Sequence, residues 1–174
     1  GSKHAGAILK LLVKRFREIW PNIKIIFRGD GAFARNRTLY WCEHNSVKYV
    51  VGMSSNARLK KMAEPICQTA KTAYEKTNEK QRIFSEVQYA AHSWHSERRV
   101  IFKAEHHSKG ENCRFILTNL KDDPQTVYDQ RYCLRGEMEN KIKQQKLDLS
   151  SDRMSCHQFM ANQARVLFSG IAYV

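Results

Sequence analysis

The first 53 residues alternate helical and strand patterns, and this alternation constrains the fold more than any other feature of the chain. Apolar residues recur at helical spacing over Ile8–Trp20, and a shorter helix is predicted over residues 33–43. Each is followed by an apolar run with β-branched residues, Ile23–Phe27 and Val47–Met53, which is typical of buried strands. Two strands joined by a helix predict a parallel pair with a crossover, so we expect an α/β fold.

The middle of the chain changes from a helical pattern to strands. A helix is predicted over Ala57–Lys76. Three strands separated by polar turns are expected after it, at Gln81–Tyr89, Arg98–Glu105 and Cys113–Asn119. We therefore expect residues 54–118 to form a largely β insertion subdomain.

The last part of the chain is predicted to be helical. Pro124 starts a long helix, and an amphipathic helix over Cys156–Tyr173 is expected to pack on the sheet. Residues 119–174 are then the C-terminal helices that complete the core begun by residues 1–53.

The long helix carries a phenol, a guanidinium, a carboxylate and an ammonium on one face. These groups fall within roughly one sixth of the helix circumference and belong to Tyr132, Arg135, Glu139 and Lys146, with Lys143 close by. An apolar stripe about a quarter turn away (Leu134, Met138, Ile142 and Leu149) puts this face at the rim of a core. The alternative is a row of surface ion pairs, because Arg135, Glu139 and Lys143 are spaced by four residues.

A second carboxylate, Asp30, lies just past the strand expected at Ile23–Phe27. In open α/β sheets, ligands bind in the crevice beyond the carboxyl ends of the strands, where an aspartate can hold a metal ion. The alternative is a turn aspartate beside two glycines, Gly29 and Gly31.

The two segments together resemble the DDE transposases, in the insertion-sequence branch with a Y-x2-R-x3-E-x6-K signature and a D-G-x-F element. The residues that match the two patterns are Tyr132, Arg135, Glu139 and Lys146, and Asp30, Gly31 and Phe33. The long insertion between the aspartate and the glutamate also fits, and the resemblance covers nearly the whole chain.

The resemblance implies an RNase H-like core that cuts and joins DNA at transposon ends. Such phosphodiester chemistry uses two divalent metals about 3.5–4 Å apart, and hard oxygen ligands suit Mg²⁺ or Mn²⁺. The resemblance assigns the metal-binding and catalytic roles to Asp30, Glu139 and one further aspartate from an earlier strand. Glu137 points about 160° away from Glu139 on an α-helix and cannot share that site.

The remaining signature residues are expected to contact DNA. Arg135 and Lys146 are interpreted as phosphate clamps, with Lys143 beside them. Tyr132 would hydrogen-bond to phosphate or order the catalytic carboxylate, unless it is an ordinary helix tyrosine packed on the sheet.

The chain departs from the family pattern in one respect, because no aspartate precedes Asp30. The later aspartates occur in the wrong order. We expect that the first strands of the core and the first catalytic aspartate are missing, so that the parent protein is an enzyme and this fragment is inactive alone.

Composition indicates the partner. Lys and Arg number 30 against 17 Asp and Glu, and the net charge of +13 favours a polyanion, here double-stranded DNA. The resemblance also implies self-association on DNA in the bacterial cytoplasm, at the nucleoid. Five scattered cysteines without a C-x-x-C pair fit reduced thiols in a cytosolic protein, and no apolar run is long enough for a membrane span.

Trp94 lies in a polar turn of the expected insertion. It could stack on a base pulled out of the duplex, or fold over the small core of the insertion. Six further cations could contact the DNA backbone, or could simply belong to a solvated surface. They are Lys60, Lys61, Lys71, Arg98, Arg99 and Lys103.

Two rival functions remain open at this point. One is a nuclease or resolvase of the same fold that hydrolyses DNA without strand transfer. The other is a domesticated, catalytically idle DNA-binding protein.

Overall fold

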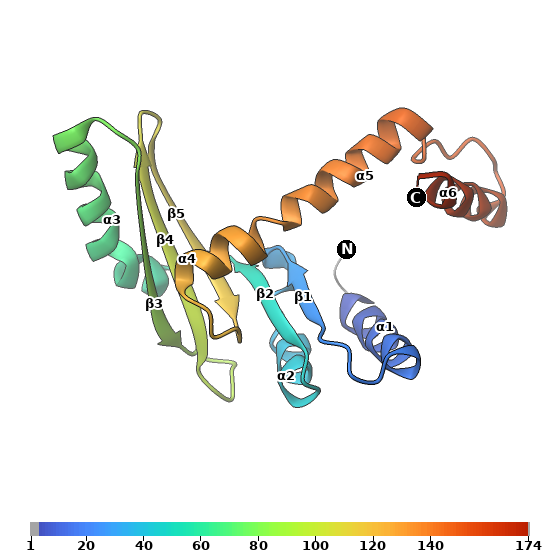
Figure 1. The fold of residues 1–174 in the computed structure, drawn as a ribbon, viewed down its shortest axis with the longest axis horizontal. Coiled ribbons are helices and arrows are strands. Elements are labelled where there is room, and N and C mark those ends of the chain that lie inside the picture. The colour runs from blue at the N-terminus through green and yellow to red at the C-terminus, as the bar shows by residue number, and fades with distance from the viewer. Residues whose placement is uncertain (1–3, 174) are drawn as a thin grey trace. The chain divides into compact units, whose positions relative to one another are not determined.

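The computed structural model describes residues 4–173 and divides the chain into two compact units. The first unit ends at Tyr132 and contains a five-stranded sheet, and the second begins at Cys133 and contains two helices (Figure 1). Within the described residues, no helix combines the length and the apolar character needed to cross a membrane.

The sheet has the strand order β1-β2-β5-β4-β3. The strands are β1 (Ile26–Gly29), β2 (Lys48–Met53), β3 (Gln81–Tyr89), β4 (Arg98–His107) and β5 (Gly110–Thr118). β1 and β2 are parallel, and the other neighbouring pairs are antiparallel. The predicted parallel pair and the mixed α/β class are therefore confirmed.

Five helical segments of the first unit accompany the sheet. They are α1 (Ala5–Ile19), α2 (Asn36–His44), α3 (Ala57–Thr77), α4 (Pro124–Thr126) and the π-helix η3 (Val127–Tyr132), with a short 3₁₀ turn, η2, at Gly31–Phe33. α2 is the crossover between β1 and β2. The three strands of residues 81–118 extend the same sheet that β1 and β2 begin, because β2 pairs directly with β5.

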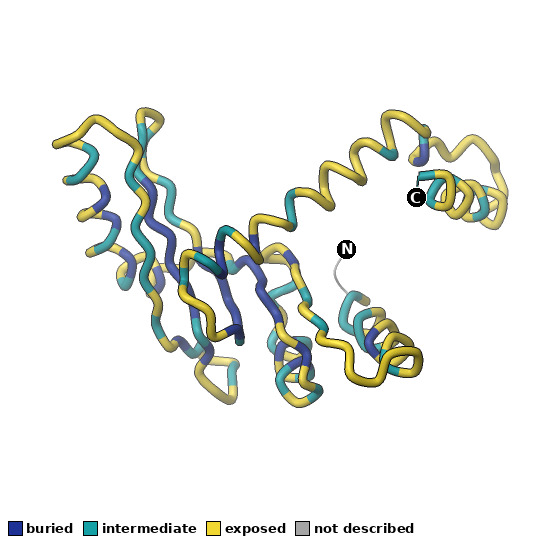
Figure 2. Tube along the Cα trace, in the orientation of Figure 1, coloured by how far each residue is buried: buried dark blue, intermediate teal, exposed yellow. Residues whose placement is uncertain are grey.

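The larger core lies on the face of the sheet covered by α2 and α3. Side chains that alternate along the strands, such as Tyr49 and Val51 on β2, point to this face and pack against Leu39 of α2 and Leu59 of α3. These side chains are almost completely buried, and Figure 2 shows the burial concentrated in the central strands.

The smaller core lies on the opposite face of the sheet. Val50, Ile101 and Ile116 point to this face and are covered by Val127 and Tyr128 of η3. The first unit is thus built of three layers, with the sheet between two helical layers.

Several predicted boundaries differ from the structure. The first strand was predicted at Ile23–Phe27, but β1 runs over Ile26–Gly29. The helix predicted over residues 33–43 is α2 at Asn36–His44, because the turn η2 occupies Gly31–Phe33. The helix expected to run on from Pro124 is interrupted, because the π-helix η3 and a turn at residues 133–134 separate α4 from α5 (Arg135–Leu149). β5 starts at Gly110, three residues before the predicted start at Cys113. Gly110 has a φ of +101°, which lets the hairpin from β4 close tightly.

The second unit consists of α5 and α6 (Phe159–Tyr173). The Tyr173 hydroxyl donates to Gln144 Oε1 at 2.8 Å and so links the two helices. The expected packing of the last helix on the sheet stays a prediction.

β1 is an edge strand. It pairs with β2 on one side, and among residues 4–173 no strand pairs with its other side. The apolar Ile26 is 38% exposed there. An apolar edge strand of this kind is available for pairing with a further strand.

Candidate active site

Asp30 lies where the sequence predicted, directly after β1 at the carboxyl edge of the parallel pair. It caps the turn η2, and its Oδ1 accepts a hydrogen bond from the Ala32 backbone N–H at 2.9 Å. The residue is exposed to solvent. Asp30 therefore acts as a turn residue and also presents its carboxylate outward, so the two interpretations made from the sequence are compatible.

Gly52 holds the turn of Asp30 against the neighbouring strand. Gly52 is buried in β2, and a Cβ built on it would lie 3.2 Å from the Gly31 backbone nitrogen and 3.5 Å from the Asp30 carbonyl carbon. A side chain at this position would push the turn away from β2. The absence of a side chain at Gly52 thus sets where Asp30 leaves the sheet.

Tyr132 reaches the same point from the far end of the chain. Its ring is 8% exposed in the smaller core and lies 5.7 Å from the Tyr128 ring. Its hydroxyl oxygen lies 2.8 Å from the position of a Cβ on Gly52. The first residue of the signature and the aspartate turn, about 100 residues apart in sequence, therefore meet around one glycine.

Sequence reasoning missed Gly52. The available signal was a glycine inside an otherwise apolar, β-branched strand, Val47–Met53. Such a glycine marks a bulge or a close approach of another group, and here it marks the close approach.

The other signature residues lie on α5 in the second unit. Arg135 and Glu139 form an ion pair four residues apart on α5, as the surface interpretation expected. Glu139, Lys143 and Lys146 are exposed, and the helix has no buried residue in the described chain. The apolar stripe predicted beside them is also exposed, with Met138 at 63%.

Tyr132 does not belong to the same helix as Arg135. It ends η3, and the turn at residues 133–134 separates it from α5. The calculation that put Tyr132 on the face of Glu139 assumed one continuous α-helix, and that assumption was wrong. Arg135, Glu139 and Lys146 all lie within α5, so the argument from α-helical spacing that puts them on one face still applies.

Trp94 packs against the larger core at the end of β3. Its ring lies 5.7 Å from the Tyr89 ring in an edge-to-face arrangement, and the Arg98 guanidinium lies 4.8 Å from its centre. These are the contacts of a tryptophan folded over a core. Stacking of Trp94 on a base stays a prediction.

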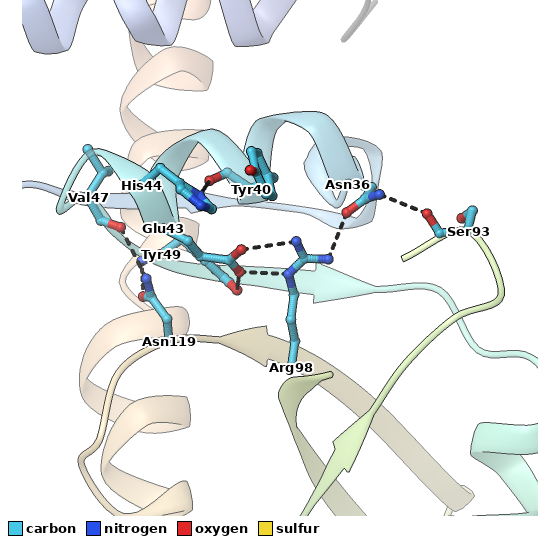
Figure 3. Close-up of polar contacts among 9 residues, drawn as sticks. All are labelled: Asn36, Tyr40, Glu43, His44, Val47, Tyr49, Ser93, Arg98 and Asn119. Carbon is cyan, nitrogen blue, oxygen red and sulfur yellow. Dashed lines mark hydrogen bonds and ion pairs between the residues drawn. The ribbon is translucent and has the colours of Figure 1, made fainter. Parts of the chain in front are cut away.

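Arg98 is the centre of a buried polar network (Figure 3). Its guanidinium donates to both carboxylate oxygens of Glu43, at 2.6 and 3.1 Å, and to Asn36 Oδ1 at 2.9 Å. Asn36 in turn donates to the Ser93 carbonyl, which fixes the loop before β4. Burial would raise the pKa of Glu43, but hydrogen bonds from Arg98 and Tyr49 outweigh burial and lower it.

Two of the six cations expected to contact DNA are buried instead. Arg98 is 4% exposed, and Lys103 is 4% exposed and donates to Glu105 Oε2 at 3.0 Å. Arg99 is held by Glu86 and by the Leu120 carbonyl. Because their charges are neutralised within the first unit, the expectation was wrong for Arg98 and Lys103.

The donor chemistry at Asp30 fits a hard divalent cation. The carboxylate is exposed and only its Oδ1 accepts a hydrogen bond from the turn, so oxygen lone pairs are left for a metal. Among residues 4–173, no three His, Cys, Asp or Glu side chains cluster closely enough to hold an ion. A metal at this edge of the sheet therefore needs carboxylates brought to Asp30 from elsewhere.

Comparison with known proteins agrees with these motifs. Neither the curated proteins nor the solved structures contain a match to the chain. A model of one protein family, described as Transposase DDE domain group 1, matches residues 1–174. Because that match spans the whole sequence, the chain belongs to the transposase DDE domain family, group 1.

Proposed function

We propose that this domain cleaves DNA at transposon ends and transfers the strands to target DNA, in a metal-dependent reaction. Membership of the DDE transposase family gives the class of enzyme and of substrate. The observation that carries the finer proposal is the meeting of the Asp30 turn and Tyr132 around Gly52. A purely structural aspartate turn would not need the start of the signature segment beside it.

Asp30 and Glu139 are the proposed metal ligands and catalytic carboxylates, and a third carboxylate completes the set. Two Mg²⁺ or Mn²⁺ ions would supply activation of the attacking oxygen and stabilisation of the leaving oxygen. The Gly52 contact holds the backbone of Asp30 at the edge of β2, so the carboxylate is positioned before any ligand binds. The Tyr132 hydroxyl supports the same turn.

The exposed cations of α5 are proposed to bind the DNA backbone. Arg135 is suited to a bidentate phosphate contact, and Lys143 and Lys146 to single contacts. The ion pair of Arg135 with Glu139 orients both side chains on one face of α5. Neutralisation of Glu139 by metal would leave Arg135 available for phosphate.

We also propose that the first unit is part of an RNase H-like core. The support is the parallel β1–β2 pair with its α2 crossover and the further strands antiparallel to β2. In this proposal residues 54–118 are the inserted part, and residues 119–174 complete the core. The expected setting is the bacterial cytoplasm at the nucleoid, with double-stranded DNA as partner and self-association on that DNA.

The test compares two glutamates of α5 in the transposase. Glu139→Gln should abolish Mg²⁺-dependent cleavage and strand transfer on a transposon-end duplex, while affinity for that duplex is nearly unchanged. Glu137→Gln is the matched control, because its side chain points about 160° away on the same helix. Equal damage from both substitutions would overturn the assignment, and cleavage without any strand transfer would favour a nuclease.

A further inference from the structure

A cavity of about 560 Å³ lies between α1 and the start of α2 in the first unit. One wall comes from α1 and the other from residues 35–38. The lining residues are Gly6, Ala7, Lys10, Arg35, Asn36, Arg37 and Thr38. Three of these lining residues are cations and none is acidic.

Contacts with the rest of the first unit fix the two walls of the cavity. Gly6 meets Thr38, since a Cβ on Gly6 would lie 2.9 Å from Thr38 Oγ1. Asn36 is fixed by Arg98 and by the Ser93 carbonyl. Val13 of α1 is buried in the larger core. The cavity is thus part of the folded scaffold, and Lys10 and Arg37 line it from its two walls.

The cavity carries two charges that no ion pair neutralises within the described residues. Among residues 4–173, neither Lys10 nor Arg37 has an ion-pair partner. The Lys10 ammonium lies 5.6 Å above the Trp41 ring, which holds it in place and leaves its charge intact. Cations gathered without carboxylates repel one another, and an anion in the cavity relieves that repulsion.

The positive lining continues into a second cavity of about 410 Å³ that shares Lys10. Lys14 and Arg17 line it from the same helix, with Glu18 as the acidic member. Glu18 is paired with Arg15 at 3.1 Å. Along α1, Lys10 to Arg17 spans about 10 Å, which matches on the order of three successive phosphates of one DNA strand.

We propose that the groove between α1 and α2, which Lys10 and Arg37 line, binds the phosphate backbone of duplex DNA. An elongated row of cations fits an extended polyanion better than a single small anion. The groove contains neither Asp30 nor Glu139 and is therefore distinct from the proposed active site. Only the identity of the polyanion as DNA rests on the proposed function.

The groove has a defined place beside the catalytic edge of the first unit. Arg35 follows Asp30 by five residues, and the short turn η2 spans that distance. α2 begins at Asn36, directly after that turn, so the groove adjoins the segment that carries Asp30. Phosphate contacts in the groove would set the position of the duplex relative to the aspartate without taking part in the chemistry.

The experiment measures binding of a mixed-sequence duplex in the presence of EDTA, as a function of salt. Arg37→Gln should weaken binding and reduce the slope of log affinity against log salt by about one unit. The double variant with Lys10→Gln and Arg37→Gln should reduce that slope by about two units. Arg37→Lys should restore the slope, because it keeps the charge. Lys76→Gln is the control, since Lys76 is an exposed cation at the end of α3 and lines neither cavity.

The outcomes are distinct from those of the active-site test, because no metal and no cleavage are involved. Thermal melting verifies that each variant is folded. An unchanged slope for folded Arg37→Gln and for the double variant would overturn the proposal. Binding of inorganic phosphate at Arg37 by NMR, without any effect of these variants on DNA, would also overturn it and indicate a site for a small anion.

Discussion

The hydroxyl oxygen of Tyr132 lies 2.8 Å from the point where a Cβ on Gly52 would stand. The same point lies 3.5 Å from the Asp30 carbonyl carbon. Three parts of the chain that are distant in sequence therefore share one small volume beside the proposed metal ligand. A methyl group at that point tests how much the site depends on this packing.

Gly52→Ala is expected to lower the free energy of unfolding by about 1–3 kcal/mol, because the added methyl overpacks a buried contact. It should also reduce cleavage activity by displacing the turn of Asp30. Tyr132→Phe removes the clashing oxygen. The double variant Gly52→Ala with Tyr132→Phe should therefore recover part of the lost stability and part of the lost activity, as measured by urea denaturation and by cleavage of transposon-end DNA.

The matched control for Gly52 is Gly136 on α5. A Cβ on Gly136 meets nothing within 4 Å outside its own helix backbone. Gly136→Ala should therefore stabilise the protein by about 0.5–1 kcal/mol through helix propensity. If Gly52→Ala proved as harmless as this control, Tyr132 would not be packed against the Asp30 turn.

Asp30 and Glu139 are expected to approach a shared metal pair. Since one lies in the first unit and the other in the second, only a structure with Mn²⁺ and end DNA can measure their separation. We expect the two carboxylates within on the order of 10 Å of each other, as two-metal chemistry requires. Carboxylates held on opposite faces of the sheet would remove the basis for the proposed site.

Arg135 and Lys146 are expected to contribute to DNA affinity independently of catalysis. Arg135→Ala and Lys146→Ala should each reduce the salt slope of binding by about one unit, because each removes a phosphate contact. Lys141→Ala is the control, since Lys141 is exposed on the opposite side of α5 from Glu139. Slopes unchanged in all three variants would leave the signature as a row of surface ion pairs.

The buried Arg98–Glu43 pair is expected to stabilise the fold. Arg98→Ala should lower the free energy of unfolding by about 3–5 kcal/mol, because it removes the ion-pair partner of Glu43 and the hydrogen bond to Asn36. Arg15→Ala breaks an exposed ion pair and should lower the free energy of unfolding by less than about 1 kcal/mol. Guanidinium denaturation of both variants provides the comparison, and similar costs would contradict this prediction.

Glu105 gives stability a defined dependence on pH. Burial would raise the pKa of Glu105, but hydrogen bonds from Lys103 and Lys80 lower it from 4.5 to about 2. A lowered pKa in the folded state contributes stability that is complete above about 4.5 and is lost as the pH falls toward 2. Between these values the free energy of unfolding should fall by at most about 1.4 kcal/mol per pH unit from this residue.

Glu105→Gln should remove that part of the pH dependence. The measurement is urea denaturation from pH 6 to pH 3 for both proteins, with the exposed Glu18→Gln as control. A wild-type curve as flat between pH 4.5 and 3 as that of Glu105→Gln would mean that Lys103 and Lys80 do not stabilise the carboxylate.

The sequence by itself determined the elements with strong local periodicity. The parallel strand pair was predicted from the apolar runs Ile23–Phe27 and Val47–Met53, with a crossover helix between them. The structure has this pair at Ile26–Gly29 and Lys48–Met53, so the pairing was predicted correctly but the first strand begins three residues later than its apolar run. The place of Asp30 follows too, because a turn after a buried strand is a local feature. The family motifs depend only on residue type and spacing and were readable without coordinates.

The tertiary structure alone decided where distant segments meet. One continuous α-helix would have placed Tyr132 on the face of Glu139. In the structure, residues 127–132 form a π-helix instead, and Val127 and Tyr128 of that helix pack on the sheet. Gly52 and the burial of Arg98 and Lys103 likewise depend on neighbours supplied by other strands and helices. Periodicity records the preferences of one segment, whereas these contacts depend on side-chain volume and charge contributed by another.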